Sequence, residues 1–277
     1  MNHLRKFFIL IFLPILVFAD NTFPWVVYYG DEINVEAFDP YNPIILDGES
    51  HSLLKQLLKK NKEVLGYLDL TEINEQSSWF LKVKQKGLLI QDNPQWPGDW
   101  AVDIRDPYWK NLVINHLAPA LISQGFTGIM IDQTDVAIAL EQQDPKKYGG
   151  MIQAAVDLIK TLRKKFPGKR LMLNRGFEIL QQVGDSIDYE LAEALYTSYN
   201  FETKKYFVQP EEGYEWEMNL LNQARTSFPH IVVFSLDYWD PEDTQMYEKI
   251  YAIERKACLR PYVSTVLLNQ IIPEPAK

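Results

Sequence analysis

The sequence predicts an α/β protein with a (β/α)8 TIM-barrel fold in a single domain. Three observations indicate this fold. Short apolar runs alternate with amphipathic runs from Pro24 onward, eight such short runs follow one another, and most of them end in a polar residue. Alternating strands and helices are typical of a parallel sheet with crossover helices. The length of 277 residues suits one barrel, which typically uses about 250 residues.

The eight expected strands are short apolar runs bounded by Gly, Pro, Asn or Asp, which is the local signature of a buried strand. They are, in chain order, Trp25–Gly30, Asn42–Asp47, Val64–Asp69, Ile129–Asp132, Arg170–Asn174, Ser186–Glu193, Ile231–Asp237 and Pro261–Val266. An open doubly wound sheet is the competing fold. It would require a Gly-rich phosphate-binding turn after an early strand, and the sequence has none.

Amphipathic helices are expected between the strands. The segment Ser50–Lys60 begins with Ser and has leucines at spacings of three and four. Asp106 and Pro107 supply an N-cap and a proline at the first helical position, and this helix should run to about Ser123. Further helices are expected over Tyr148–Phe166, over Glu215–Ser227, and from Pro241 through Cys258. Cys258 is the only cysteine, and its helical surroundings favour a small core residue over a nucleophile.

Two segments interrupt the alternation. Between the third and fourth strands, Gly87–Asp92 and Trp100–Arg105 flank a turn rich in Pro, Gly and Trp. We therefore expect a hairpin-like insertion, within Glu72–Asp106, over the mouth of the barrel. The polar and aromatic segment between Glu193 and Glu215 is expected to be a long loop.

Residues 1–19 have the pattern of a signal peptide. Arg5 and Lys6 precede an apolar run from Phe7 to Phe18, and Val17 and Ala19 are small enough for a signal-peptidase site. No later segment reaches about 18 consecutive apolar residues. We therefore expect an exported protein, periplasmic or secreted, with no stable membrane anchor and with the barrel domain over residues 20–277. An uncleaved anchor is the alternative.

The charge balance limits the partners. The formal net charge is −9, and without Arg5 and Lys6 it becomes −11. Such a surface repels nucleic acid and other polyanions and suits neutral or cationic substrates. Solubility alone also accounts for this charge. With one cysteine, the protein has no internal disulfide, so an exported chain must depend on its core for stability.

Polar residues, mostly acids, stand at or just after the ends of the expected strands. They are Asp47, Asp69 with Glu72, Asp132 with Asp135, Asn174 with Arg175, Glu193, and Asp237 with Tyr238. Side chains at the carboxyl ends of barrel strands project into the mouth. Clustered carboxylates repel and raise one another's pKa, which is the condition for pairing a proton donor with an ionised partner. For Asp132 alone, a helix-capping or turn role is the alternative.

Aromatic residues accompany the acids, and their faces suit stacking on sugar rings, although packing in the core or a lid is the alternative for each. They are Trp25, Tyr28, Tyr67, Trp96, Trp100, Tyr199, Tyr238 and Trp239. Other chemistries lack their motifs. His51, His116 and His230 have no metal-ligand spacing, and there is no Gly-x-Ser-x-Gly elbow and no phosphate loop. No metal and no cofactor are expected.

An ordered set of motifs resembles the endo-α-1,4-polygalactosaminidase family of glycoside hydrolases, glycoside hydrolase family 114, and its exported bacterial relatives. The resemblance extends from Trp25 to about Ile272. The motifs are Gly66-Tyr-Leu-Asp-Leu-Thr-Glu72, Trp100-Ala-Val-Asp-Ile-Arg105, Gly125-Phe-Thr-Gly-Ile-Met-Ile-Asp-Gln-Thr-Asp135, Asn174-Arg-Gly-Phe177, Ala192-Glu193, Leu236-Asp-Tyr238 and Arg260-Pro-Tyr-Val-Ser264.

The resemblance implies a (β/α)8 fold and cleavage of α-1,4-linked galactosamine-containing polysaccharide by an Asp after strand four and a Glu after strand six. These map to Asp132 and Glu193, with Asp135 and Glu190 as the runners-up. The remaining candidates are assigned to contacts with a polysaccharide or oligosaccharide partner, which free amines would make cationic. They are Tyr28, Asp47, Tyr67, Asp69, Glu72, Asn174, Arg175, Asp237 and Tyr238.

Two departures from the family pattern concern Gly66–Glu72, where the family more often has Gly-Tyr-x-Ser-x-Gly-Glu, and Thr127, where it usually has Asp. The first lies at the rim and affects substrate identity more than catalysis. Two other functions therefore stay open. One is a non-catalytic carbohydrate-binding or polysaccharide-assembly protein on the same barrel, and the other is a barrel hydrolase for another α-glycoside.

Overall fold

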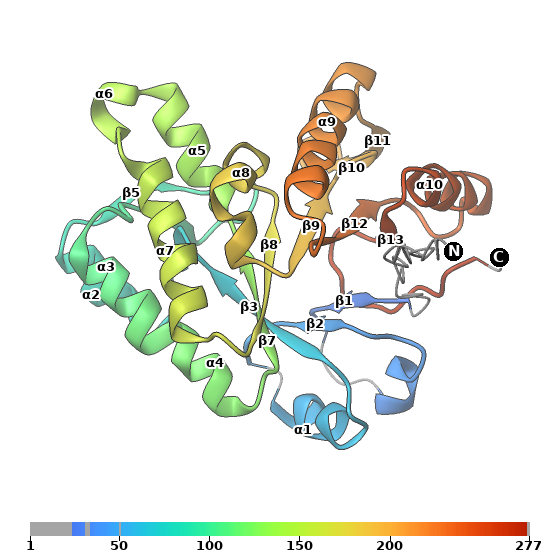
Figure 1. Ribbon diagram of the computed structural model, residues 1–277, viewed down its shortest axis with the longest axis horizontal. Helices are drawn as coiled ribbons and strands as arrows, with labels where there is room; N and C mark the ends of the chain where they lie inside the picture. The colour runs from blue at the N-terminus through green and yellow to red at the C-terminus, as the bar shows by residue number, and fades with distance from the viewer. Residues whose placement is uncertain (1–23, 31–33, 50, 276–277) are drawn as a thin grey trace, which may run out of the picture.

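The computed structural model describes residues 24–30, 34–49 and 51–275. The expected signal peptide, residues 1–19, lies outside these ranges. Within them, eight strands form one parallel sheet whose order follows the chain (Figure 1). The strands are β1 Val26–Tyr28, β2 Ile44–Leu46, β3 Val64–Asp69, β7 Gly128–Asp132, β8 Arg170–Asn174, β9 Tyr189–Glu193, β12 Val232–Tyr238 and β13 Arg260–Ser264. All eight lie where the sequence predicts strands.

The sheet curls into a nearly closed barrel, which confirms the predicted (β/α)8 class. The first and last strands approach each other, since the Trp25 indole Nε1 donates a hydrogen bond to the carbonyl of Arg260 at 2.8 Å. The strands are buried along most of their length because helices cover the outside and side chains fill the inside. Gly128 shows how tightly the strands pack, because a Cβ there would lie 2.6 Å from the Arg170 carbonyl oxygen.

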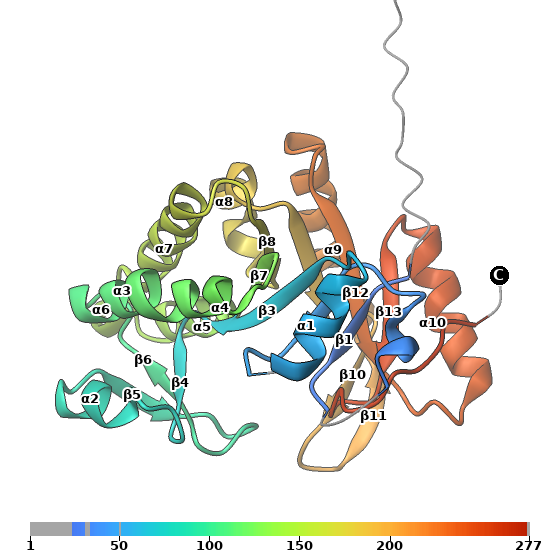
Figure 2. The same ribbon diagram turned by 90° about the horizontal axis from the view of Figure 1, so that it is seen from below.

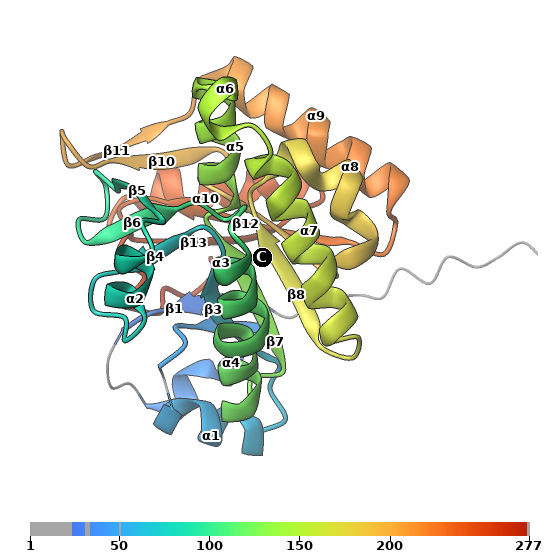
Figure 3. The same cartoon turned by 90° about the vertical axis from the view of Figure 1, so that its left-hand side faces the viewer.

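Helices surround the barrel, and on one flank α7 runs beside the helical stretch that leads from α3 into α4 (Figures 1 and 3). The α-helices outside the insertion between β3 and β7, together with those that follow it, are α1 His51–Lys59, α3 Pro107–Leu112, α4 Ala118–Gln124, α5 Thr134–Gln143, α6 Pro145–Tyr148, α7 Met151–Lys165, α8 Leu180–Val183, α9 Glu211–Ser227 and α10 Thr244–Lys256. Among the described residues, none of these helices has the length and apolar character needed to cross a membrane.

The predicted helix after Asp106 is confirmed, with one irregularity. The Asp106 side chain accepts a hydrogen bond from the Tyr108 amide at 2.7 Å, as an N-cap does. Between α3 and α4 the chain makes a π-helical turn, Val113–Leu117. Pro119 explains it, because a proline has no N–H to continue the regular helical bonding there.

Several boundaries differ from the predictions. Helix α9 begins at Glu211 rather than Glu215, and α7 begins at Met151 because Gly150 is left-handed, with φ of 94°. Cys258 is exposed rather than a core residue, since it follows α10 in a left-handed conformation. The segment expected as a long loop contains an antiparallel hairpin of β10 Thr197–Asn200 and β11 Lys205–Val208. Cross-strand pairing of its aromatic side chains stabilises that hairpin.

The insertion between β3 and β7 is larger than the hairpin that the sequence predicts. The expected strands pair, as β5 Leu89–Asp92 and β6 Asp99–Val102. A third strand, β4 Glu72–Asn74, pairs on the other side of β6, and helix α2 Phe80–Gln85 follows it. This small sheet and the β10–β11 hairpin project from the same side of the barrel (Figure 2).

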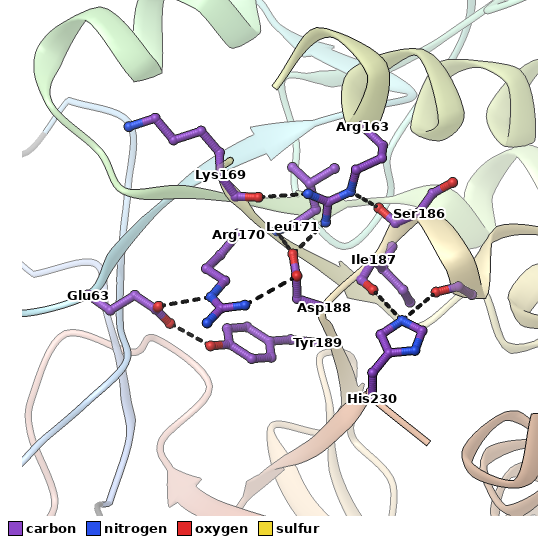
Figure 4. A network of polar contacts seen from close by, with 11 residues as sticks. Glu63, Arg163, Lys169, Arg170, Leu171, Ser186, Ile187, Asp188, Tyr189 and His230 are labelled. Atoms are coloured by element: carbon purple, nitrogen blue, oxygen red, sulfur yellow. Dashed lines mark hydrogen bonds and ion pairs between the residues drawn. The ribbon is translucent and has the colours of Figure 1, made fainter. Parts of the chain in front are cut away.

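A polar network ties the opposite end of the barrel, where β3, β8 and β9 begin (Figure 4). Arg163 on α7 binds Asp188 at 2.5 Å, just before β9. Arg170, at the start of β8, lies 3.3 Å from both Asp188 and Glu63. Tyr189 donates to Glu63 at 2.8 Å. Polar contacts, most of them charge-assisted, therefore connect the starts of β3, β8 and β9 at the end of the barrel away from the mouth.

Candidate active site

A cavity of about 510 Å³ lies at the carboxyl ends of the barrel strands. Its walls combine acids and aromatic rings, namely Asp47, Asp69, Asp99, Asp132 and Glu193 with Tyr29, Tyr67, Trp96 and Tyr238. A smaller cavity of about 310 Å³ adjoins it and shares the floor of Asp132, Asn174 and Glu193. We call these the main cavity and the side cavity. Trp96 lines both of them.

The floor is made by the last residues of three neighbouring strands. Asp132 ends β7, Asn174 ends β8 and Glu193 ends β9. The Asn174 amide nitrogen donates to Asp132 Oδ1 at 2.8 Å and also to Glu193 Oε2. One buried amide therefore holds the two carboxylates that the sequence predicts to be catalytic.

The residue after each of these strand ends is left-handed, although none of the three is glycine. Gln133, Arg175 and Ala194 have φ values of 62°, 56° and 54°. This conformation is uncommon outside glycine and carries a free-energy cost that the surroundings must offset. It turns the chain sharply as soon as the polar residue has been presented. The Gln133 amide also donates to Asp132 Oδ1 at 2.8 Å.

Tyrosine hydroxyls surround the carboxylates. Tyr238 donates to Glu193 Oε1 at 2.5 Å, and Tyr67 is hydrogen-bonded to Asp132. Burial, followed by the charges of nearby carboxylates, raises the pKa of Tyr29, Tyr67 and Tyr238 well above its usual value. These phenols therefore stay protonated and act as donors to carboxylates or to sugar oxygens.

The electrostatics of the floor favour a shared proton. Burial, followed by the charge of Glu193, raises the pKa of Asp132 from its ordinary value to about 7. Burial also raises the pKa of Asp69, whose Cα is the cross-strand neighbour of that of Asp132, well above its usual range. Near neutral pH the floor can therefore hold one carboxylic acid beside one carboxylate.

The two runners-up lie away from the floor. Asp135, in the first turn of α5, lines the side cavity and lies 3.4 Å from the Arg175 guanidinium. Glu190 is 1% exposed and lines neither cavity, since it faces away from the barrel interior. Burial raises the pKa of the Glu190 carboxyl well above its usual value, although the charge of Arg175 acts in the opposite direction.

Most of the expected substrate-contact residues face the cavities. Asp47, Tyr67, Asp69, Asn174 and Tyr238 line the main cavity, and Arg175 lines the side cavity. Arg175 also donates to the Glu193 carbonyl at 2.6 Å and to Glu217 at 2.9 Å. Its guanidinium therefore braces the chain that follows Glu193.

Three expected contacts lie elsewhere, namely Tyr28, Glu72 and Asp237. Side chains alternate along a strand, so Val27 and Tyr29 face the main cavity while Tyr28 packs edge-on against Phe38. Glu72 is 4% exposed and accepts a hydrogen bond from Asn93 at 3.1 Å. In the structure these three side chains pack or form hydrogen bonds within the fold and do not line either cavity.

Asp237 anchors the β10–β11 hairpin. It is fully buried, and its Oδ1 accepts hydrogen bonds from the backbone amides of Tyr196 and Thr197 at 2.8 and 2.5 Å. Burial raises the pKa of this carboxyl to about 7. Its neighbours Leu236 and Tyr238 face the main cavity, so alternation again decides which side chain reaches the mouth.

The structure adds cavity residues that the strand-end argument misses. Tyr29 and Asp99 line the main cavity, and Phe201 lines the side cavity. The rings of Trp96, from the insertion, and Phe201, from the hairpin, lie 5.1 Å apart. The two excursions thus meet over the mouth. The period-two pattern of strand one could have predicted Tyr29. Asp99 and Phe201 reach the site only through tertiary packing, which such a pattern does not contain.

Two solved structures resemble this fold. The glycoside hydrolase domain of PelA from Pseudomonas aeruginosa superposes with a TM-score of 0.79 at 18% identity, covering 91% of this chain and 98% of that chain. Ega3 from Aspergillus fumigatus, in complex with galactosamine, superposes with a TM-score of 0.66 at 14% identity, covering 89% and 92%. At these identities the likeness shows a common fold.

The sequence also matches one curated protein and one family of proteins. An uncharacterized protein of Methanocaldococcus jannaschii, MJ1477, is 31% identical over 91 residues, which is 31% of this chain and 25% of that protein's length. The chain therefore matches only a quarter of this relative. The sequence pattern of glycoside-hydrolase family GH114 matches residues 18–276. Because that match covers nearly the whole chain, the protein belongs to glycoside-hydrolase family GH114.

Proposed function

We propose that this family GH114 glycoside hydrolase cleaves within chains of α-1,4-linked galactosamine-containing polysaccharide, with Asp132 and Glu193 as the essential pair. The observation that carries the proposal is the Asn174 amide, which donates to both carboxylates on the cavity floor. Glycoside hydrolysis needs one carboxyl group to protonate the leaving oxygen and a second to attack or to activate water. The raised pKa of Asp132, about 7, allows the pair to hold one proton at neutral pH.

The shared amide also favours a mechanism with retention of configuration. Each N···O hydrogen bond is about 3 Å long, so two oxygens bound to one nitrogen lie no more than about 6 Å apart. Retaining enzymes have carboxyl groups about 5–5.5 Å apart, and inverting enzymes about 6.5–9.5 Å apart. The second carboxyl would then form a covalent glycosyl intermediate that water hydrolyses.

The lining of the main cavity supports a cationic sugar. Five of the described residues that line this cavity are acids, and no lysine or arginine is among the described lining residues. Free amines of a galactosamine polymer could pair with Asp47, Asp69 or Asp99, which surround the floor. The likeness to Ega3, whose structure holds galactosamine, agrees with this chemistry.

We infer export from residues 1–19, whose basic start, apolar run and small residues before Asp20 are those of a cleaved signal. N-terminal sequencing of the protein recovered outside the cytoplasm should begin at Asp20. Recovery of a chain that still begins at Met1 would contradict cleavage.

The activity is tested by incubating the mature protein with partially acetylated α-1,4-galactosamine oligomers and identifying the products by mass spectrometry. We expect shorter oligomers from the wild type and none from Glu193→Gln or Asp132→Asn. A matched control is Glu248→Gln, because Glu248 is an exposed residue of α10 and lines neither the main cavity nor the side cavity.

Two outcomes would count against the proposal. Cleavage of another α-linked oligosaccharide, with none of the galactosamine oligomers, would identify a different α-glycosidase. Binding of the oligomers without cleavage, by the wild type and by Glu193→Gln alike, would indicate a carbohydrate-binding barrel that has lost turnover.

A further inference from the structure

A third cavity, with a volume of about 430 Å³, lies between the β10–β11 hairpin and the segment that follows β13. Its walls are the hairpin rings Tyr199, Phe201 and Tyr206 and the segment that follows β13, including Thr265, Asn269 and Gln270. We call it the hairpin groove. It shares Tyr199, Phe201 and Val266 with the side cavity, so the groove continues the cleft outward from the catalytic floor.

We infer that the hairpin groove is a distal subsite for an uncharged, N-acetylated amino-sugar residue of the same polymer that is cleaved at the floor. This inference rests on the proposed function for the identity of the polymer. The polymer would pass from the main cavity beneath the contact between Trp96 and Phe201 and continue along the hairpin.

The hairpin groove differs from the main cavity in the charge of its lining residues. Among the described residues that line the groove, Lys204 is the only charged one, whereas the main cavity carries five acids. A free amine would be repelled by Lys204 and would find no carboxylate there. An anionic sugar would be repelled by the acids of the adjoining cleft. An uncharged sugar residue is repelled neither by Lys204 nor by the acids of the cleft.

The polar groups of the groove suit an acetamide and sugar hydroxyls. Asn269 and Gln270 supply amides, which both donate and accept hydrogen bonds. Both side chains are exposed, so they can reach a sugar residue that lies in the groove.

The aromatic wall is continuous and braced. Tyr199 contacts Phe201 and Tyr206 at ring-centroid distances of 5.3 and 5.0 Å, and Tyr206 contacts Trp239 at 6.0 Å. The Tyr206 hydroxyl is hydrogen-bonded to the backbone of Val266, which fixes the hairpin against the segment after β13. Fixed rings provide apolar area for a sugar face at little cost in conformational entropy.

The test measures binding, by calorimetry, to mature Glu193→Gln, which is expected not to turn over its ligand. The probes are an N-acetylated α-1,4-galactosamine octamer and the trimer, which is too short to occupy the floor and the groove together. We expect the octamer to bind about tenfold more tightly than the trimer. Adding Tyr206→Ala or Gln270→Ala should abolish that difference and leave trimer affinity unchanged.

Phe207→Ala is the matched control, since Phe207 is the next residue of β11, is 38% exposed and lines none of the three cavities. It should preserve the tenfold difference. Gln270→Ala guards against misfolding of the hairpin, because Gln270 is an exposed residue outside regular structure. Equal affinities for octamer and trimer, or full octamer affinity in both variants, would overturn the inference. Absence of hydrolysis by the wild type would overturn only the proposed function, because these binding measurements need no turnover.

Discussion

Asn174 donates from one amide nitrogen to Asp132 and to Glu193, and it is 2% exposed. Its side chain therefore sets the distance between the two carboxylates and stabilises negative charge on either of them. A neutral amide can do this throughout a catalytic cycle because it does not titrate. A residue with a single donor could not bond to both carboxylates at once.

Asn174→Ala should lower kcat by about 100-fold, which is typical of removing one preorganised donor from an active site. KM should change little, because the loss falls on the reacting groups. Steady-state kinetics on galactosamine oligomers would measure both constants. Asn219→Ala, at an exposed position of α9, is the control. An unchanged kcat for Asn174→Ala would show that the amide does not position the pair.

The raised pKa of Asp132 predicts how stability depends on pH. The folded protein binds this proton with a pKa of about 7, against an ordinary value of 3.8. The folded state therefore holds more protons than the unfolded state between these two values. By linkage, the contribution of Asp132 to the free energy of unfolding is largest below pH 4 and falls as the pH rises through 7.

Asp132→Asn removes the buried charge and should therefore raise Tm at pH 8, by about 5 °C, and change it much less at pH 4. Thermal unfolding followed by circular dichroism at both pH values would measure the effect. Asp135→Asn is the matched control, because Asp135 is nearby and half-exposed and pairs with Arg175. The same Tm for wild type and Asp132→Asn at pH 8 would contradict the argument.

At the scale of elements, the mouth of the barrel carries the candidate active site, whereas the base carries ion pairs that stabilise the strands. At the mouth, β7, β8 and β9 end in polar residues that are followed by left-handed turns. Such turns cost free energy, and like charges on the floor add to the cost. At the base, the network of Arg163, Asp188 and Arg170 holds the starts of β8 and β9, two of these three strands. The stable end offsets the strain of the functional end.

Arg163→Ala should lower Tm by roughly 5 °C or more, as expected for a loss of about 2 kcal/mol. The guanidinium donates to the Ser186 and Lys169 carbonyls at 2.9 Å each, as well as to Asp188. Arg163→Lys should rescue little, since an ammonium group cannot reproduce the planar set of donors. Lys164→Ala, at the exposed next position of α7, is the control. Full rescue by lysine would indicate that charge alone matters there.

At the scale of the whole molecule, the net charge and the cavity charge have the same sign. The chain without its first 19 residues carries −11, and the main cavity is lined by five acids. A polymer with free amines is therefore attracted both at long range and at the floor. Long-range attraction is screened within about 8–10 Å at physiological salt.

Salt should therefore weaken the cleavage of deacetylated oligomers more than that of acetylated ones. Between 20 and 200 mM NaCl we expect kcat/KM to fall about tenfold for fully deacetylated oligomers, through loss of electrostatic steering. For fully acetylated oligomers of the same length it should stay nearly constant. Initial rates at low substrate concentration would measure both. Equal salt dependence for the two substrates would remove the argument for cation recognition.

The sequence by itself determined the order and type of the barrel elements. Eight apolar runs bounded by turn residues are local signals, and all eight strands lie where those signals predict them. It also determined that Asp132 and Glu193 end their strands. Parallel strands of a barrel bring such ends to one rim, so their proximity followed from the fold class.

The tertiary structure decided what local signals do not contain. Alternation along a strand means that a shift of one residue turns a side chain away, and this excluded Tyr28 and Asp237 from the main cavity. The β10–β11 hairpin, the contact between Trp96 and Phe201, and the Asn174 bridge join residues far apart in the chain. Their geometry depends on packing between elements, which no local run of residues specifies.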